Sequence, residues 1–528
     1  MSTFPVIGAW IDSIPFGLDF DSGSDAGLVQ SPSGSVVSFT TWSDAHYNVP
    51  GDWVSSSSDS DSEASESELE ELERSVVFDG ASDISDSGSS FVLPGSHWTE
   101  SDFEDDDNSD AESETSTVQY EHEPFETYQH RAVALARSRV WPELSSETPI
   151  SAEKMHGGYF NRCIGLNVGN VDDDSDESSD SQGIRAILRI PRSLPTDIDQ
   201  EIGTHLFVQQ RVPDVPVAEL LSFSLTEDNE IESPFAVQRR VMATNLVEQY
   251  ANLDQATKCR VARELGNAIR HMTQTKSSVL GDMMPPTADG QFSIAAFDYH
   301  RVIPFASALV MVKMEVAPRD PAFTHPYDGS GHIETPIYDL LKTTFEAQKA
   351  EYHRRFPRQN HEHFDGFLAM LEDMRLGGYL DDDMPYTLAH MDLGPQNVLF
   401  DPQADSQSQS ITVLDWDIAG FQPVFMACEP PMWLWAWPED DQSYEWDEKK
   451  ANHIPETAEN QEIKAAFEQA AGPDYMRYAY NPVYRLGRTL VDFSQRGLHC
   501  DEDDERCKDM LDEWAAIRSS FVKEELDN

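Results

Sequence analysis

The sequence predicts an α+β fold in two lobes, preceded by a long polar tail. Residues 1–124 are rich in Ser, Asp, Glu and Gly, residues 125–241 contain the main strand patterns, and residues 242–528 read mainly as helices. Strands that precede a run of helices, rather than alternate with them, are typical of α+β proteins. A chain of 528 residues is long enough for such a fold and a tail.

The tail is expected to be disordered, because it cannot bury enough apolar surface to offset the entropy lost on ordering. It carries acidic runs such as Ser55–Glu73 and Ser101–Glu114. Its aromatic clusters, Trp42 to Trp53 and Phe91 to Trp98, are either short docking motifs or isolated apolar residues in a solvated segment. Protein contacts through this tail are therefore one open alternative.

Charge and cysteine content limit the classes of partner and compartment. The chain has 37 basic and 96 acidic residues, a formal net charge of -59, which argues against nucleic acid or an anionic membrane as partner. The five cysteines include no C-x-x-C pair, which indicates reduced thiols in a cytoplasmic or nuclear protein. The apolar stretch Pro304–Val312 is too short to span a bilayer, and Met1–Phe20 lacks the basic start of a targeting signal.

The N-terminal lobe, residues 125–241, is expected to hold a small sheet. Alternating apolar and β-branched residues predict strands, and two of these would form a hairpin around the acidic insert 172–183. The expected strands are Tyr159–Val168, Ile184–Ile190 and Pro234–Val241, and the expected helices are Ala132–Trp141 and Asp197–Val208.

The C-terminal lobe, residues 242–528, is expected to be mainly helical. The clearest helix is Asp254–Thr273, where Asp254 is a candidate N-cap and Val261, Leu265 and Ile269 lie on one face. Thr335 and Pro336 form a start signal for another helix. The remaining expected elements are helices from 335 to 356, Phe364–Met374, Arg485–Arg496 and Cys507–Leu526, and the strands Asn397–Asp401 and Ile411–Leu414.

One motif carries the chemistry. His390, Asp392 and Asn397 have the spacing H-x-D-x-x-x-x-N, and Asp415 follows after a predicted hairpin. Phosphoryl transfer to a hydroxyl needs a carboxylate that orients the nucleophile and oxygen ligands that hold Mg²⁺ against the phosphates. Asp392 suits the first task, whereas Asn397 and Asp415 suit the second. His390 is better placed to fix the loop by hydrogen bonds.

This motif resembles that of the aminoglycoside phosphotransferase family, which shares the protein-kinase fold, and in particular its functionally unassigned fungal members. The resemblance covers about Met155 to Arg496. It implies a protein-kinase-like fold, ATP and Mg²⁺ as cofactors, Asp392 as catalytic base, and Asn397 with Asp415 as metal ligands. Asp417 would bind the metal indirectly.

The resemblance extends to the N-terminal lobe. It implies that a loop with Gly157, Gly158 and Asn161 covers the nucleotide, that Arg189 on the third strand reaches the α- and β-phosphates, and that Glu201 is its ion-pair partner. Backbone groups near Arg239 and Arg240 would contact the adenine.

The chain also departs from the family pattern. Arg189 stands where lysine is usual, and Met391 where glycine is frequent. Trp416 and Asp417 replace the Phe-Gly of protein kinases, no activation-loop motif follows, and the G-x-G-x-x-G loop is absent. A small-molecule acceptor is therefore expected rather than a protein.

The role of several residues after Asp417 has two possible interpretations. Tryptophans 433, 435, 437 and 446 could form an aromatic wall at the substrate site or belong to the core, and the acidic residues between 439 and 447 could attract a cationic substrate or be a solvated loop. Three functions also stay open: a phosphotransferase, a pseudokinase or nucleotide-binding interaction module, and a structural protein without nucleotide.

Overall fold

The protein is described by a computed structural model. It describes residues 124–155, 161–169, 184–191, 198–297, 324–355, 362–404, 408–437, 448–498 and 501–527. All of these belong to one compact unit, Ser89–Asn528. The predicted disordered tail, the acidic insert 172–183 and the pair Gly157-Gly158 lie outside the described residues.

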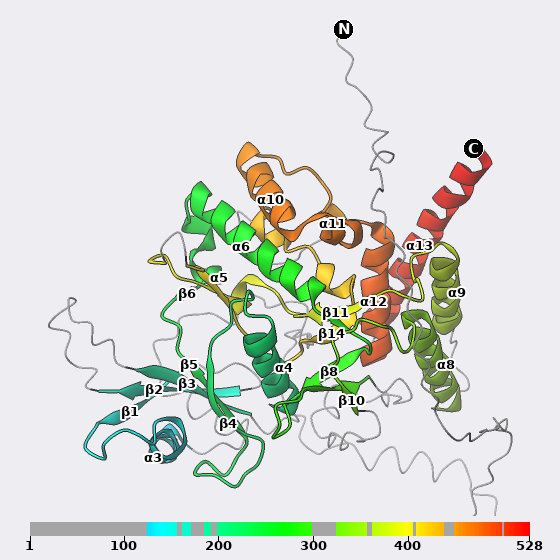
Figure 1. Ribbon diagram of the computed structural model, residues 1–528. Coiled ribbons are helices and arrows are strands. Elements are labelled where there is room, and N and C mark those ends of the chain that lie inside the picture. The colour runs from blue at the N-terminus through cyan, green and yellow to red at the C-terminus, as the bar shows by residue number, and fades with distance from the viewer. Residues whose placement is uncertain are drawn as a thin grey trace, which may run out of the picture. The chain divides into compact units, whose positions relative to one another are not determined.

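A five-stranded antiparallel sheet forms the N-terminal portion (Figure 1). Its order is β1-β2-β3-β5-β4, so the predicted hairpin β2–β3 lies at its centre. Strand β1 pairs with β2, and β4 pairs with β5; neither β1 nor β4 was predicted. The strands are β1 (Ile150–Lys154), β2 (Asn161–Val168), β3 (Arg185–Pro191), β4 (Leu220–Ser224) and β5 (Phe235–Arg239).

The two faces of this sheet have different coverings. Helix α3 (Phe125–Leu135) ends in a π-helical turn, Ala136–Val140, and starts seven residues before the predicted helix. Its buried Tyr128 and Leu135 form an apolar cluster with Ile164 and Leu188 of the sheet. Since side chains alternate along a strand, Cys163 and Arg189, which are paired across β2 and β3, lie on the opposite face.

Helix α4 (Ile198–Arg211) connects this sheet to the rest of the unit. Gln200 Nε2 donates to Asp282 Oδ1 (3.0 Å), and Thr204 Oγ1 donates to the carbonyl of Ala419 (3.2 Å). A Cβ on Gly203 would lie 2.2 Å from the Met283 carbonyl oxygen, so only glycine allows this approach of α4 to strand β8 (Gly281–Met284). Glu201 is thereby fixed between the two portions.

The C-terminal portion contains more sheet than expected. Beside its helices it has a six-stranded sheet of order β10-β9-β8-β14-β11-β7, so the expectation of a mainly helical lobe missed most of these strands. They are short, with two to four residues each: β7 (Lys276–Ser277), β8 (Gly281–Met284), β9 (Ser293–Ala296), β10 (Thr324–Pro326), β11 (Tyr386–Ala389) and β14 (Gly420–Pro423).

The predicted helices are present. Helix α6 begins after Asp254, whose side chain accepts a hydrogen bond from the Thr257 amide (2.9 Å), as expected for an N-cap. Helices α6 and α10 lie side by side, as do α8 and α9 (Figure 1). The helices are α5 (Leu246–Gln249), α6 (Gln255–Gln274), α8 (Ile337–Arg355), α9 (Glu362–Leu376), α10 (Ala458–Ala471), α11 (Pro473–Ala479), α12 (Pro482–Arg496) and α13 (Asp501–Asp527).

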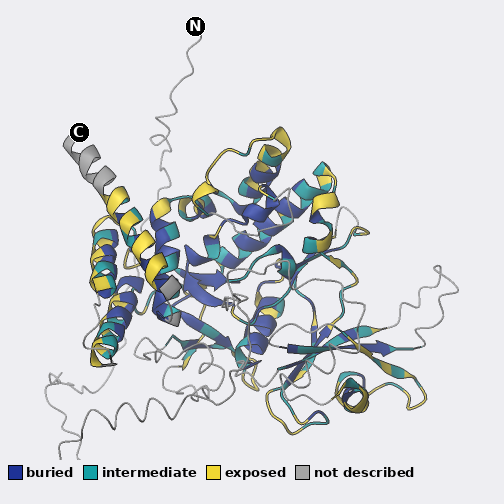
Figure 2. Ribbon diagram, turned by 180° about the vertical axis from the view of Figure 1, so that it is seen from behind, coloured by how far each residue is buried: buried dark blue, intermediate teal, exposed yellow. Residues whose placement is uncertain are grey.

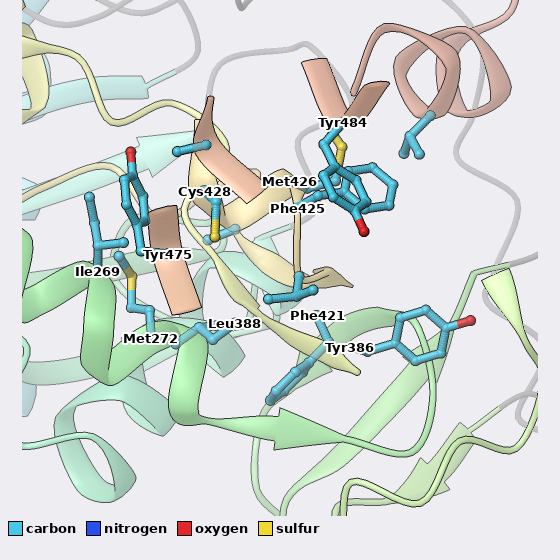
Figure 3. Close-up of a cluster of buried hydrophobic side chains, with 14 of the residues drawn as sticks. Ile269, Met272, Tyr386, Leu388, Phe421, Phe425, Met426, Cys428, Tyr475 and Tyr484 are labelled. Atoms are coloured by element: carbon cyan, nitrogen blue, oxygen red, sulfur yellow. The ribbon is translucent and has the colours of Figure 1, made fainter. Parts of the chain in front are cut away.

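A large apolar core lies between these helices and the six-stranded sheet. The buried residues gather along the inner faces of α6 and the strands (Figure 2). Figure 3 shows part of this core, where Met272 of α6, Leu388 of β11 and Phe421 of β14 are all buried. Trp433 and Trp435 are also buried in it, so for these two the core interpretation holds and not the aromatic wall.

A third, small sheet carries the predicted hairpin. Strand β12 (Val398–Phe400) pairs with β13 (Ile411–Val413) and with β6 (Thr244–Asn245). The Val413 amide also donates to the Pro216 carbonyl (2.8 Å). The hairpin is therefore anchored to the segment that leads from α4 into β4.

Two residues beside this hairpin have an unusual backbone. Met391 and Asp415 have φ values of +68° and +61°. This left-handed region costs a non-glycine residue about 1–2 kcal/mol. Glycine is frequent at the position of Met391 in the motif that this chain resembles, and the positive φ at this position explains why glycine is favoured there.

Membrane and disulfide predictions can be compared with the described residues. None of the helices described there is long and apolar enough to cross a membrane. Cys163, Cys259, Cys428 and Cys507 are free thiols. Cys500 lies outside the described residues.

Replacement of Gly266 by alanine should destabilise the core. Helix propensity alone would favour alanine by roughly 1 kcal/mol, but the added Cβ would lie 2.7 Å from the Phe467 carbonyl oxygen in α10. We expect the free energy of unfolding to fall by about 2 kcal/mol, measured by urea denaturation. Gly366→Ala is the matched control, because its Cβ meets only the movable Leu511 side chain. Equal stability of the two variants would contradict this packing.

Replacement of Met391 by glycine should relieve backbone strain. Because Met391 also packs partly against the core, Met391→Ala serves as the reference that loses the same packing. We expect Met391→Gly to be about 1 kcal/mol more stable than Met391→Ala. Thermal melting of the two variants measures the difference, and a lower melting temperature for the glycine variant would refute the assignment of strain.

Candidate active site

His390 fastens the loop that follows strand β11. The residue is only 3% exposed, and its Nε2 lies 2.8 Å from the Leu414 carbonyl oxygen. The Asp392 amide donates to Nδ1 (3.4 Å), so a neutral ring with its proton on Nε2 satisfies both contacts. Burial lowers the pKa of His390, which favours this neutral form. The ring also packs edge-on against Trp416.

Asp392 is held by two amide side chains from the 3-10 turn Pro395–Asn397. Asn397 Nδ2 donates to Asp392 Oδ2 (2.8 Å) and to its carbonyl oxygen (2.9 Å), and Gln396 Nε2 donates to Oδ1 (3.2 Å). Burial and the charge of Asp415 raise the pKa of Asp392, against the opposing effects of His390 and the two amides. Asp392 is thus an oriented carboxylate. Gln396 was not predicted as a site residue.

Asp415 lies next to this loop through the backbone of Leu414. The Leu414 amide donates to the Asn397 carbonyl (2.8 Å), while its own carbonyl accepts from His390. The Asp415 side chain is 42% exposed. Burial opposes its ionisation, but the charge of Arg189 outweighs this and lowers the pKa of Asp415 to about 2. The structure therefore brings Asp392, Asn397 and Asp415 together.

Arg189 joins the N-terminal sheet to this loop. Its Nη2 lies 2.8 Å from Asp415 Oδ1 and 3.0 Å from Asp417 Oδ1, and its Nε lies 3.0 Å from Glu201 Oε1. Although burial would lower the pKa of Arg189, the three carboxylates raise it. Burial raises the pKa of Asp417, and Glu201 and Asp415 add to this effect. The predicted pair Arg189–Glu201 is present, within a larger cluster.

Asn161, the first residue of β2, also reaches this cluster. Its Nδ2 donates to Asp417 Oδ2 (3.4 Å), and the residue is buried. Asn161 was predicted to belong to the nucleotide-covering loop, but it is the first residue of a strand, and Gly157 and Gly158 lie outside the described residues. Both oxygens of Asp417 therefore have partners.

Arg239 and Arg240 pair with carboxylates other than those of this cluster. Their side chains pair with Glu219 (2.7 Å) and Glu153 (2.7 Å). Their amides donate to the carbonyls of Glu219 (2.7 Å) and Arg185 (3.0 Å). These two amides are therefore not available to a purine base, which would have to bind other backbone groups of this segment.

The oxygen donors of Asn397 and Asp415 fit Mg²⁺. Asn397 turns the donor end of its amide toward Asp392, and carboxylate and amide oxygens are the ligands that a hard cation prefers. Within the described ranges, no three His, Cys, Asp or Glu side chains could hold a metal ion by themselves. A metal here would therefore need the amide oxygen, and ligands from a bound nucleotide.

One core tryptophan contacts the loop that contains Asp392. Trp433 Nε1 donates to the Leu393 carbonyl (3.2 Å), which links the core to the residue after Asp392. Trp437 is partly buried against the same core. Trp446 and the acidic residues between 439 and 447 lie outside the described residues.

Comparison with known proteins gives one family. A family model described as the phosphotransferase enzyme family matches residues 175–479, a shorter range than the expected Met155–Arg496, so β1 and β2 precede it. No curated protein matches the chain.

The solved structures that match the chain are distant from it. The GDP complex of wild-type aminoglycoside 2'-phosphotransferase-IIIa is 15% identical, covers 74% of this chain and 99% of that chain, and has a TM-score of 0.36. A spectinomycin phosphotransferase with ADP and spectinomycin is 11% identical, covers 74% and 94%, and has a TM-score of 0.32. An ADP-bound aminoglycoside phosphotransferase is 8% identical, covers 73% and 96%, and has a TM-score of 0.38. These values are too low to transfer a substrate.

The family model is the stronger finding, because it matches more than half of the chain and contains the motif from His390 to Asp417. The α+β fold expected from the sequence agrees with it. The chain belongs to the phosphotransferase enzyme family.

Proposed function

We propose that this chain transfers the γ-phosphoryl group of ATP to a hydroxyl group of a small molecule. One observation carries the proposal: Asp392, Asn397 and Asp415 are joined in one hydrogen-bonded unit. Asn397 Nδ2 donates to Asp392 Oδ2 (2.8 Å), and the Asn397 carbonyl accepts from the amide of Leu414 (2.8 Å), the neighbour of Asp415. Phosphoryl transfer needs this combination of an oriented carboxylate and oxygen ligands.

In this mechanism Asp392 accepts the proton of the acceptor hydroxyl. Asn397 and Gln396 hold the carboxylate by one hydrogen bond to each oxygen, which fixes its direction. Its raised pKa makes Asp392 a better proton acceptor than an ordinary aspartate. His390 positions the loop and does not touch the reacting atoms.

Asn397 and Asp415 would hold Mg²⁺, which when bound neutralises charge on the phosphates. Arg189 would contact the phosphates from the sheet, with Glu201 as its support. Gly157, Gly158 and Asn161 would cover the nucleotide, and backbone groups around Arg239 and Arg240 would contact the base. The lobe boundaries, 125–241 and 242–528, are part of the same proposal.

A small molecule is the proposed acceptor because the chain has Trp416-Asp417 and no activation-loop motif where protein kinases present a protein substrate. The free cysteines agree with a cytoplasmic or nuclear location, which we also propose. Protein contacts through the acidic tail stay a prediction.

A second candidate is a nucleotide-binding module with little or no turnover. The observation that favours it is Arg189 at the position of the usual lysine, with its guanidinium group already in ionic contact with Glu201, Asp415 and Asp417. Arginine is not an equivalent substitute for a lysine that contacts phosphates, because its planar guanidinium presents its charge differently from a compact ammonium group. Turnover measurements separate the two candidates.

Replacement of Asp392 by asparagine tests the role of the base. We expect the nucleotide affinity to stay within about threefold and the transfer rate to fall by about 10²–10⁴, because proton acceptance is lost. Phosphate transfer from ATP to a panel of amino alcohols, sugars and polyols measures the rate, and calorimetry measures nucleotide binding.

Two variants serve as controls for this experiment. Asp401→Asn changes an aspartate of the same hairpin whose carboxylate accepts from the Gln403 amide (2.8 Å), so its rate should equal that of the wild type. Asp415→Ala should abolish metal-dependent transfer. An unchanged rate in Asp392→Asn would exclude Asp392 as the base, and nucleotide binding without transfer to any acceptor would favour the second candidate.

A further inference from the structure

The guanidinium group of Arg189 contacts Asp415, the carboxylate that would hold a metal ion, and the neighbouring Asp417. Its Nη2 atom lies between Asp415 Oδ1 (2.8 Å) and Asp417 Oδ1 (3.0 Å). Arginine stays protonated at any physiological pH, so the Arg189 guanidinium places a permanent positive charge at the site. A divalent cation and Arg189 therefore compete for the carboxylate of Asp415.

Neighbouring residues hold Arg189 in this position. Glu201, buried in α4, pairs with its Nε (3.0 Å), and Asp417 is itself fixed by Asn161, which donates to Oδ2 (3.4 Å). Since both oxygens of Asp417 are engaged by protein partners, the structure assigns Asp417 to the anchoring of Arg189 rather than to a metal. A planar fork with five donors can serve several carboxylates at once, which a compact ammonium does less well.

We infer that Arg189 acts as an internal cation that keeps divalent metal out of the site until a nucleotide binds. Phosphate groups offer the guanidinium a competing anion and draw it away from Asp415, which then becomes free for the metal. Nucleotide and metal would therefore bind with strong positive coupling, whereas metal alone would bind weakly. This inference rests on the proposed nucleotide site.

The test measures Mn²⁺ binding to the full-length chain without nucleotide, by electron paramagnetic resonance of free Mn²⁺. Removal of the charge in Arg189→Met should tighten Mn²⁺ binding about tenfold or more, because the repulsion between two cations a few ångströms apart disappears. Arg185→Met is the matched control. It removes an arginine from the same face of the same strand, four residues away, and should change the affinity by less than about twofold.

A background of weak Mn²⁺ binding is expected because the chain carries a net charge of -59. The double variant Arg189→Met with Asp415→Asn identifies the site, since it should lose the gain. Equal affinities of Arg189→Met and wild type would overturn the inference. An equal gain in Arg185→Met, or a gain that survives Asp415→Asn, would also overturn it.

Loss of Arg189 leaves the buried Glu201 without its partner and could unfold the chain. Arg189→Met combined with Glu201→Gln avoids this, because it also removes the charge of the buried Glu201, and the same tenfold gain is expected from it. Nucleotide titration of the wild type, with and without Mn²⁺, separates the two proposals. If nucleotide binds but the Mn²⁺ affinities do not differ between wild type and variants, only this inference fails. If no nucleotide binds under either condition, the proposed function fails and the coupling with it.

Discussion

The two peptide groups of Leu414 hold the site together. The amide donates to Asn397 and the carbonyl accepts from His390, so one residue connects both ends of the H-x-D-x-x-x-x-N loop to the aspartate that follows it. The contact with Asn397 joins two backbone groups, and the contact with His390 uses a buried ring that packs against Trp416, so both fix the positions of Asp392, Asn397 and Asp415. Through Leu414, residues that are separated in the sequence motif lie close together in the fold.

The same region joins the N-terminal sheet to the C-terminal portion. The Val413 amide binds Pro216, and Val217 forms a parallel bridge with Val413, immediately before the loop with Asp415. Arg189 adds ionic contacts from the sheet to Asp415 and Asp417. A change in the position of the sheet would therefore be felt directly at these carboxylates.

Buried charge and backbone strain both accumulate at this point. Removing an arginine and several carboxylates from water is costly, and their attraction offsets that cost only when all partners are present. Positive φ angles at Met391 and Asp415 add to the cost. Such concentrations of strain and charge persist where the surrounding structure enforces them, and they are typical of functional sites.

The sequence by itself determined the long elements and the order of the site residues. Helix α6 followed from its apolar period and the Asp254 cap, and the hairpin β12–β13 followed from two short apolar runs around a polar turn. These signals are local, so they survive without knowledge of the fold. The spacing from His390 to Asp415 likewise identified the loop that the structure assembles.

Tertiary structure alone decided the rest. Strands of the six-stranded sheet have two to four residues, too few for a periodic signal, and β11 finds its partner β14 about thirty residues later, where Ala389 pairs with Gly420. The sequence predicted a pair between Arg189 and Glu201 but not the contacts of Arg189 to Asp415 and Asp417. It left open whether Trp433 and Trp435 belong to the core, and the fold buries both. Such contacts depend on which residues, far apart in the sequence, come close in space, and no local sequence pattern encodes that.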